Sequence, residues 1–419
     1  MGNAHLVTEP SHSRVIGMAD IENNRTTSID IKIIRDHIPA HCFQPSTLRS
    51  IAFVLHDLSF YFAFLAGTLY IINYVDSWTC FVLCYVIFPY LAGICLTGLW
   101  VLGHEAGHGA FSNNNAVATS VGFLIHSAMM SPYFAWKSSH ARHHQHMNNL
   151  STDPNYVPPL YKEYGRVFGN HTGRSDWDDM MEDAPIVVFL RILLQQLIGW
   201  PWYLLSHITA GSNSSPRKSR GWWDNSHFLP NSSLFRTDEF WKILASDAGI
   251  LAMCAALYIL GQNFGFVFIF WTYVLPLIWV NHWIVMITYL HHTSPSLPKY
   301  TPESWTYLRG AFATVDRDPG FVLRHMFHHI IDTHVVHHLF PRIPHYHSQE
   351  ATEAIKPLLG AYYHVDRISL WRALWIAFTE CQWVEPDSDK TVKANVYNSR
   401  PDTLEADARG VLWYRPGCS

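Results

Sequence analysis

Histidines occur in clusters whose spacing suits metal binding. The three clusters are 104–108 (HEAGH), 140–144 (HARHH) and 334–338 (HVVHH). On a helix, residues three or four positions apart lie on one face, so each cluster directs two or three imidazoles toward a common point. Neutral nitrogen ligands in this number suit two metal ions of borderline softness better than one. The sequence therefore predicts a metal centre built from His104, His108, His140, His143, His144, His334, His337 and His338.

A fourth segment, 325–329 (HMFHH), repeats the H-x-x-H-H spacing of two of these clusters. The chain has 27 histidines in 419 residues, so the spacing by itself can include a decoy. A single histidine is more often structural than a ligand. We therefore rely on the clusters jointly, and we expect segment 325–329 to lie outside the metal centre.

The first cluster also matches H-E-x-x-H, the zinc-protease helix in which Glu105 would be the general base. That function would leave the other clustered histidines without a role. Gly103, Gly107 and Gly109 would also weaken such a helix, each by up to about 1 kcal/mol. A metal transporter would place its ligands inside membrane spans, facing a pathway. Here the clusters lie at span ends and in long polar segments, so both alternatives are disfavoured.

Composition indicates a membrane protein. Charged residues make up 15% of the chain, well below the roughly 25% of soluble domains, whereas 49% of residues are hydrophobic. The net charge of −4 gives no basic field for nucleic acid, so no nucleic-acid partner is expected. The seven cysteines contain no C-x-x-C pair, which argues against a disulfide framework or a zinc ribbon.

Four apolar stretches are long enough to cross a bilayer, which takes about 20 residues. They are residues 51–72, 78–102, 243–260 and 264–290. Stretches 116–136 and 186–208 are interrupted by polar residues and are predicted to be interfacial or re-entrant helices. The expected fold is an all-α integral membrane protein with two transmembrane hairpins, interfacial helices and a cytosolic cap that holds the histidines.

The links within the hairpins, 73–77 and 261–263, contain no lysine or arginine. The positive-inside rule therefore places both termini and all long segments in the cytosol. We divide the chain into a polar N-terminal region (1–50), a membrane domain (51–385) and a C-terminal tail (386–419).

Several further segments carry a specific pattern. They are 38–43 (IPAHCF), 288–293 (TYLHHT), 308–318 (LRGAFATVDRD), 332–341 (DTHVVHHLFP) and 344–347 (PHYH). With these segments and the clusters, the chain resembles the membrane fatty acyl desaturases of the delta-12 (omega-6) type in their fungal form. The similarity runs from about residue 33 to 384, with a short match at 410–412 (GVL).

This resemblance implies oxygen-dependent desaturation of an acyl chain by two non-haem irons. It adds His292 as a ninth ligand to the eight clustered histidines. The chain has no haem-binding domain and no flavin or G-x-G-x-x-G motif, so a separate electron donor is needed. The family implies cytochrome b5 and its reductase as that donor, a membrane lipid or acyl substrate, and the endoplasmic reticulum as the location.

Five residues are candidates to support the ligands. Glu105, Asp153 and Asp332 could orient imidazoles through the second ring nitrogen, or lie in solvated loops. Thr288 occupies the position where some relatives use an asparagine to hold a metal-bound water. His328 matches a family histidine, and we expect it to support the ligands or to be structural.

Two residues depart from the family pattern beside the ligands. The usual first cluster reads HECGHQ, whereas this chain has Ala106 and Gly109. If this turn borders the substrate channel, the smaller side chains would reshape it and alter the product. Hydroxylation or formation of a triple bond by an acetylenase, on an acyl or specialised-metabolite chain, is therefore the alternative outcome.

Overall fold

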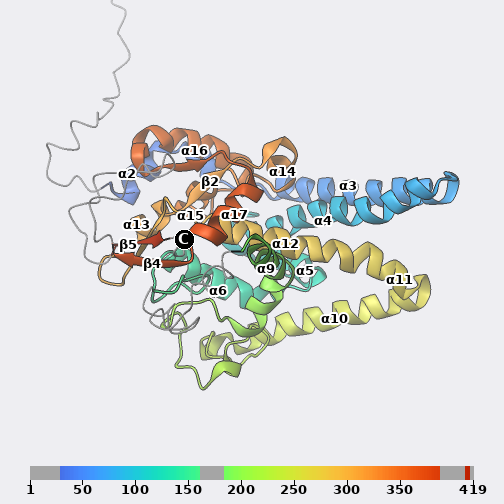
Figure 1. Ribbon diagram of the computed structural model, residues 1–419, viewed down its shortest axis with the longest axis horizontal. Coiled ribbons are helices and arrows are strands. Elements are labelled where there is room, and N and C mark those ends of the chain that lie inside the picture. The colour runs from blue at the N-terminus through green and yellow to red at the C-terminus, as the bar shows by residue number, and fades with distance from the viewer. Residues whose placement is uncertain (1–28, 161–183, 387–410, 416–419) are drawn as a thin grey trace, which may run out of the picture.

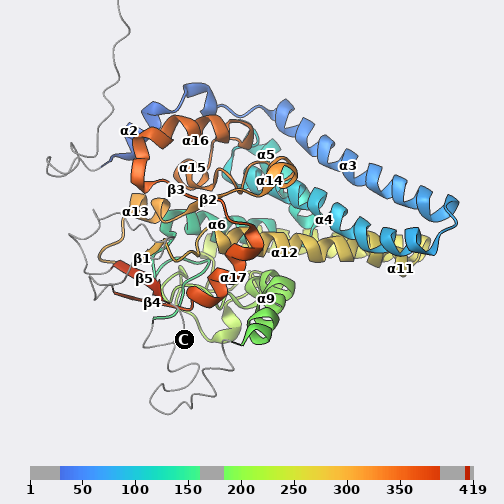
Figure 2. The ribbon, with the colours of Figure 1, turned by 45° about the horizontal axis from the view of Figure 1, so that its top comes forward.

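The computed structural model describes residues 29–160, 184–386 and 411–415. Two long helical hairpins extend in one direction from a cap of short helices and strands (Figure 1). The same arrangement is visible after a 45° rotation (Figure 2). The long helices carry the apolar stretches, and the cap carries most of the clustered histidines.

The first hairpin consists of α3 (Thr47–Tyr74) and α4 (Trp78–His108). Each helix begins after a serine whose hydroxyl accepts a hydrogen bond from the first turn, Ser46 from the Arg49 amide and Ser77 from the Cys80 amide. Large apolar side chains are exposed along α3, as expected for a helix that faces lipid. This hairpin confirms the first two predicted spans.

The second hairpin begins with α10 (Phe240–Phe264) and reverses at Gly265. Its return arm runs through α11 (Phe266–Ile269), the π-helical turn η4 (Phe270–Val274) and α12 (Leu275–Leu290). Gly265 has φ +90°, which a residue with a side chain rarely adopts. The last two predicted spans therefore also form as helices.

A fifth described helix, α9 (Pro185–Ser206), is also long and apolar enough to cross a membrane. We predicted an interfacial or re-entrant helix here. Both views show α9 lying across the direction of the four long helices, against α12 (Figures 1 and 2). This crosswise position agrees with an interfacial helix, although length and composition alone would permit a crossing.

The helices of the cap are short and are interleaved with loops. They are α2 (Ile31–His37), η1 (Ala40–Phe43), α5 (Asn115–Ala128), α6 (Tyr133–His146), η2 (Trp222–Asp224), η3 (Thr237–Glu239), α13 (Tyr307–Phe312), α14 (Gly320–Met326), α15 (His334–Leu339), α16 (His345–Leu359), η5 (Gly360–Tyr362) and α17 (Leu370–Glu380). Among them, α5 packs between α4 and α10, and α6 contacts α4, α5 and α10.

The cap also contains two small sheets, which the all-α prediction did not include. Strands β1 (Pro298–Tyr300) and β4 (Trp383–Pro386) flank β5 (Val411–Arg415) in an antiparallel sheet. Strands β2 (Val315–Arg317) and β3 (His364–Asp366) pair in parallel. The central position of β5 means that residues 411–415 of the predicted tail (386–419) are part of the cap.

The main hydrophobic core joins the inner ends of the long helices to the cap. It includes Leu102 of α4, Trp136 of α6, Trp283 of α12 and Phe327, all of them buried. Because α4 and α12 both end in this core, their last residues enter the cap at a fixed separation. These two ends position the first histidines of the site.

Candidate metal centre

The first cluster lies on the last turn of α4. His104 and His108 are separated by one helical turn and direct their rings to the same side. Gly103 allows this turn to pack closely, because an added Cβ would lie 2.4 Å from the ring of buried His126. His126 in turn stacks on Trp100 and contacts Trp136. The glycine that argued against a protease helix therefore has a packing role here.

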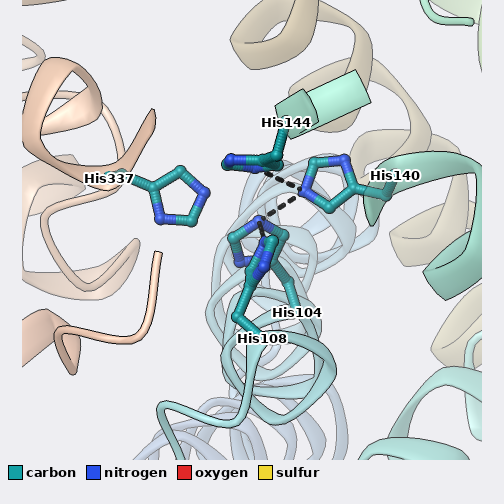
Figure 3. A group of neighbouring side chains, drawn as sticks. All are labelled: His104, His108, His140, His144 and His337. Atoms are coloured by element: carbon teal, nitrogen blue, oxygen red, sulfur yellow. Dashed lines mark hydrogen bonds between the residues drawn. The ribbon is translucent and has the colours of Figure 1, made fainter. Parts of the chain in front are cut away.

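Five imidazoles converge on one point, and they come from three separate segments (Figure 3). They are His104 and His108 of α4, His140 and His144 of α6, and His337 of α15. The Nε2 atom of His140 lies 3.0 Å from that of His104 and 3.2 Å from that of His144. One nitrogen of each of these five residues lies within 4.8 Å of all the others, close enough to share one metal ion. We call them the first group.

A second group contains His143 of α6, His292, and His338 of α15. The Nε2 atoms of His143 and His292 are 3.2 Å apart. His334 adjoins this group, since its Nε2 lies 3.0 Å from that of His338 and 3.4 Å from that of His292. The structure thus brings all nine predicted ligand histidines into two neighbouring sets.

The two groups share a boundary. The rings of His144 and His338 stack with their centroids 4.2 Å apart and their planes 15° from parallel. Adjacent histidines of α6 and of α15 contribute to different groups, because successive helical residues point about 100° apart. The x-x-H-H ending of two clusters therefore divides its histidines between the two groups.

The arrangement of the ring nitrogens suits metal ions better than a network of hydrogen bonds. A neutral imidazole has one N–H donor and one acceptor nitrogen. The Nε2 of His104 faces those of both His140 and His108, at 3.0 and 3.2 Å, so protons cannot pair all these nitrogens. A metal ion between them would accept every lone pair. Imidazole-only sites of this kind suit iron, zinc and copper.

Two of the rings have a partner that fixes their orientation. The Nδ1–H of His143 donates to the Asp153 carboxylate at 2.8 Å, and that of His334 donates to the Ile330 carbonyl at 3.1 Å. Each bond leaves Nε2 free to face the group. Asp153 is itself held by the backbone amides of Asn148 and Asn155. This geometry is the one proposed for Asp153 from the sequence, although ligand function itself stays a prediction.

Burial keeps six of the grouped imidazoles neutral. The residues His144 and His338 are buried and His140 is partly buried, and burial together with the neighbouring imidazoles lowers the pKa of each well below its usual value. The pKa values of His292, His334 and His337 are lowered in the same way. Neutral imidazole is the form that binds a metal, so the site is ready for metal without losing protons.

Glu105 does not occupy the position of a protease base. Its Oε2 accepts a hydrogen bond from the backbone amide of His345 at 3.0 Å, and its Oε1 lies 3.8 Å from Nδ1 of His104. The carboxylate therefore links α4 to the start of α16, behind the imidazoles. It is 3% exposed, which leaves little room for the water that a zinc protease activates.

The other candidate supports lie elsewhere. The hydroxyl of Thr288 donates to the Ile284 carbonyl inside α12. Asp332 contacts His329 and Arg324 rather than a grouped imidazole. The Nε2–H of His328 donates to the Asp57 carboxylate of α3 at 2.7 Å, which makes His328 a link between the cap and the first hairpin.

Sequence reasoning missed Lys299 and Asp316 as supports. The Lys299 ammonium is buried and donates to the His292 carbonyl and to Asn148; burial lowers its pKa to about 8. Asp316 accepts from the Val335 amide at 2.8 Å and so holds α15. Of these two residues, only Asp316 could have been identified from the sequence, because it lies in segment 308–318, which resembles the family.

Comparisons with known proteins agree with this geometry. A family model described as Fatty acid desaturase matches residues 76–369. The chain is 41% identical to a delta(12)-oleate desaturase of Trichosanthes kirilowii, with 91% of this chain and 94% of the relative covered. It is 37% identical to a delta(12) fatty acid desaturase of Mortierella alpina, with coverages of 88% and 91%. It is also 39% identical to an oleate hydroxylase of Claviceps purpurea, with coverages of 95% and 84%.

Proposed function

The chain belongs to the fatty acid desaturase family, and we propose that it desaturates an oleoyl-type acyl chain at the delta-12 position. One C–H bond would break on each of two adjacent methylene carbons, and a carbon–carbon double bond would form. One dioxygen, two electrons and two protons balance the reaction, and two waters leave. The observation that carries the proposal is the convergence of nine imidazoles, buried or partly buried, from four segments into two adjoining groups.

The residues fit two iron ions, which when bound supply the reductive activation of dioxygen. The first group, His104, His108, His140, His144 and His337, would hold one iron. His143, His292, His334 and His338 would hold the other. Asp153 and the Ile330 carbonyl keep their histidines oriented through Nδ1, and Lys299 holds the backbone at His292. The burial of all nine rings, complete or partial, limits the access of bulk water.

The electrons have to come from outside the chain, since it contains no haem or flavin motif. We assign this role to cytochrome b5 and its reductase at the cytosolic face of the endoplasmic reticulum. Purified protein should turn over with reduced cytochrome b5 and not with NADH alone. Turnover with NADH alone would contradict a separate donor.

The proposed topology puts both termini and every long segment on the cytosolic side. Asn213 and Asn231 begin N-x-Ser/Thr sequons in the segment between α9 and η3. Neither should carry a glycan, because glycosylation takes place on the lumenal side. A glycosidase-sensitive shift that is lost in Asn231→Gln would contradict the topology. It would also make α9 a true crossing rather than an interfacial helix.

Hydroxylation is the second candidate, favoured by the 39% identity to the oleate hydroxylase over 95% of this chain. The predicted cause was the loss of larger side chains at Ala106 and Gly109. The structure places Ala106 in an apolar cluster with Phe111 and Ala118, rather than among the imidazoles. Gly109 ends α4 with φ +76°, so glutamine there would cost about 1 kcal/mol in backbone strain. These two positions therefore give no structural support for an altered product.

Expression in a host without delta-12 activity tests the function directly. Gas chromatography with mass spectrometry would distinguish the new diene from a hydroxylated or acetylenic acid. We expect the diene, with its second double bond at carbon 12, to be the main product. A main product with a hydroxyl group and no diene would establish the second candidate. Active protein containing zinc and no iron would overturn both.

A further inference from the structure

A second set of metal-binding side chains lies outside the two imidazole groups. It combines His41 and Cys42 of η1 with His347 and Glu350 of α16. One donor atom from each residue lies within 4.8 Å of all the others. None of the four belongs to the histidine clusters, and the two pairs are about 300 residues apart in sequence. We refer to this set as the His-Cys-Glu site.

The distances are close to those of a tetrahedral zinc site. With zinc–nitrogen and zinc–oxygen bonds near 2.0–2.2 Å and zinc–sulfur near 2.3 Å, neighbouring ligand atoms lie about 3.3–3.6 Å apart. Nε2 of His41 is 3.7 Å from Sγ of Cys42 and 2.9 Å from Oε2 of Glu350. Nδ1 of His347 is 3.8 Å from the same Glu350 oxygen. The other pairs of donor atoms among these four residues lie within 4.8 Å of each other, so a modest closing movement would place an ion among the four atoms.

We propose that the His-Cys-Glu site binds one zinc ion and thereby fastens η1 to α16. Two imidazoles, one thiolate and one carboxylate are ligand types that zinc accepts in four-coordinate sites. The mixture of sulfur, nitrogen and oxygen also differs from the all-nitrogen groups of the candidate iron centre. The two sites would therefore prefer different metals.

Access and rigidity both suit such a site. The side chains of His41 and Glu350 are about half exposed, at 56% and 49%, so an ion can enter from solvent. Cys42 is fully buried, and its neighbours Ile34 and Ile38 pack in one cluster with residues of α15 and α16. A zinc ion would thus connect the half-exposed side chains of His41 and Glu350 to the buried thiol of Cys42. Figure 2 shows α2 and α16 side by side at this edge of the cap.

The location gives the ion a structural consequence. α16 begins at His345, whose amide is bonded to Glu105 of α4, and α15 with its three ligand histidines precedes it. The apolar cluster beneath the site includes Val335 and Val336 of α15. Fastening η1 to α16 would therefore stabilise the surroundings of the third histidine cluster without contributing a ligand to it.

Metal binding at this site has to displace a proton. Burial and the nearby Glu350 carboxylate raise the pKa of the Cys42 thiol to about 11, so the thiol is neutral without a cation. Zinc binds the thiolate, so binding releases that proton.

The test uses full-length protein that has been loaded with iron, to which one equivalent of Co²⁺ is added as a spectroscopic substitute for zinc. A thiolate-to-cobalt charge-transfer band should appear, and neither imidazole group contains a cysteine that could produce it. His41→Gln and Glu350→Gln should each lower cobalt affinity at least about tenfold and leave iron content unchanged. Because these two side chains are half exposed, the variants should fold normally.

Matched controls lie on α16 and on α2, the helix that precedes η1. His37→Ala on α2 and Glu353→Gln on α16 change exposed residues that are outside the site, and they should bind cobalt as the unaltered chain does. Zinc should raise the unfolding temperature of the unaltered chain and of the controls, but not that of His41→Gln. Absence of the charge-transfer band, or an equal zinc effect in His41→Gln, would overturn the proposal and leave an ordinary surface His–Glu pair. Because the band depends on Cys42, it tests this site even if the imidazole groups bind no iron.

Discussion

Segments 325–329 (HMFHH) and 334–338 (HVVHH) have the same histidine spacing and begin nine residues apart, yet they fold differently. In the second segment all five residues lie on α15, so His334, His337 and His338 share a helical face. In the first segment α14 ends at Met326, and His328 and His329 have φ of +51° and +61°. The three histidines therefore point in different directions.

The partners of each segment differ in the same way. The histidines of 334–338 enter the two imidazole groups. Those of 325–329 each find a separate partner, namely the Phe321 carbonyl for His325, Asp57 for His328 and Asp332 for His329. The comparison teaches that H-x-x-H-H brings its imidazoles together with other histidines only where the helix continues through all five residues.

The largest effect is expected in the second segment. His337→Ala removes one of five nitrogens from the first group. Iron per chain should fall toward one, and desaturation should fall by at least about 100-fold, because loss of a ligand exceeds the 10–100-fold cost of losing a ligand's support. Metal analysis and product yield measure the two effects. Full activity with two irons would show that His337 is not a ligand.

The next largest effect is expected for a change at His328, and it should alter the stability of the fold rather than the iron content. His328→Ala leaves the fully buried Asp57 carboxylate with His56 as its one side-chain partner among the residues that the structure describes. The expected cost is about 3 kcal/mol, the lower end of the range for breaking a buried pair, because His56 stays in place. The unfolding temperature should fall while iron per folded chain is unchanged.

A double-mutant cycle separates this pair from general damage to the turn. In an Asp57→Ala background no carboxylate remains to be left unpaired, so His328→Ala should cost much less. Equal costs in both backgrounds would mean that His328 acts through the turn itself. Loss of iron in the single variant would instead return segment 325–329 to the metal centre.

A third contrast concerns two carboxylates that each hold a histidine. Asp153→Ala removes the acceptor for His143, and metal affinity should fall 10–100-fold. Asp153→Asn keeps an acceptor oxygen and should be milder. Asp332→Ala is the matched control, since Asp332 holds His329 outside the groups and its loss should leave metal affinity unchanged. Dialysis against a chelator, followed by iron analysis, ranks the three variants.

The features predicted well from the sequence are those set by local pattern. Runs of apolar residues determine the long helices, and spacing on α4, α6 and α15 determines which imidazoles point together. These patterns depend on neighbours within one or two turns, so they can be read without the rest of the chain. The nine predicted ligand histidines accordingly come together in the structure.

Features set by distant contacts were not predicted. Strand β5 pairs with β1, which lies more than 100 residues earlier in the sequence. Neither short strand has a sequence pattern that predicts this pairing. The positive φ values of His328 and His329 depend on how the turn meets α3 through Asp57. Lys299 is a support only because folding buries it beside the His292 carbonyl. The His-Cys-Glu site likewise joins two segments that tertiary packing alone brings together.

The smallest effect is expected at His325. Its ring is exposed on the last turn of α14, and its one hydrogen bond joins Nδ1 to the Phe321 carbonyl of the same helix. His325→Ala should therefore change the free energy of unfolding by less than about 0.5 kcal/mol and should leave iron content and product yield unaltered. Metal analysis, thermal unfolding and fatty acid profiles measure these together, with His337→Ala as the positive control. A clear loss of iron in His325→Ala would mean that the third H-x-x-H-H segment reaches the metal after all, and that spacing outweighs the helix break at Met326.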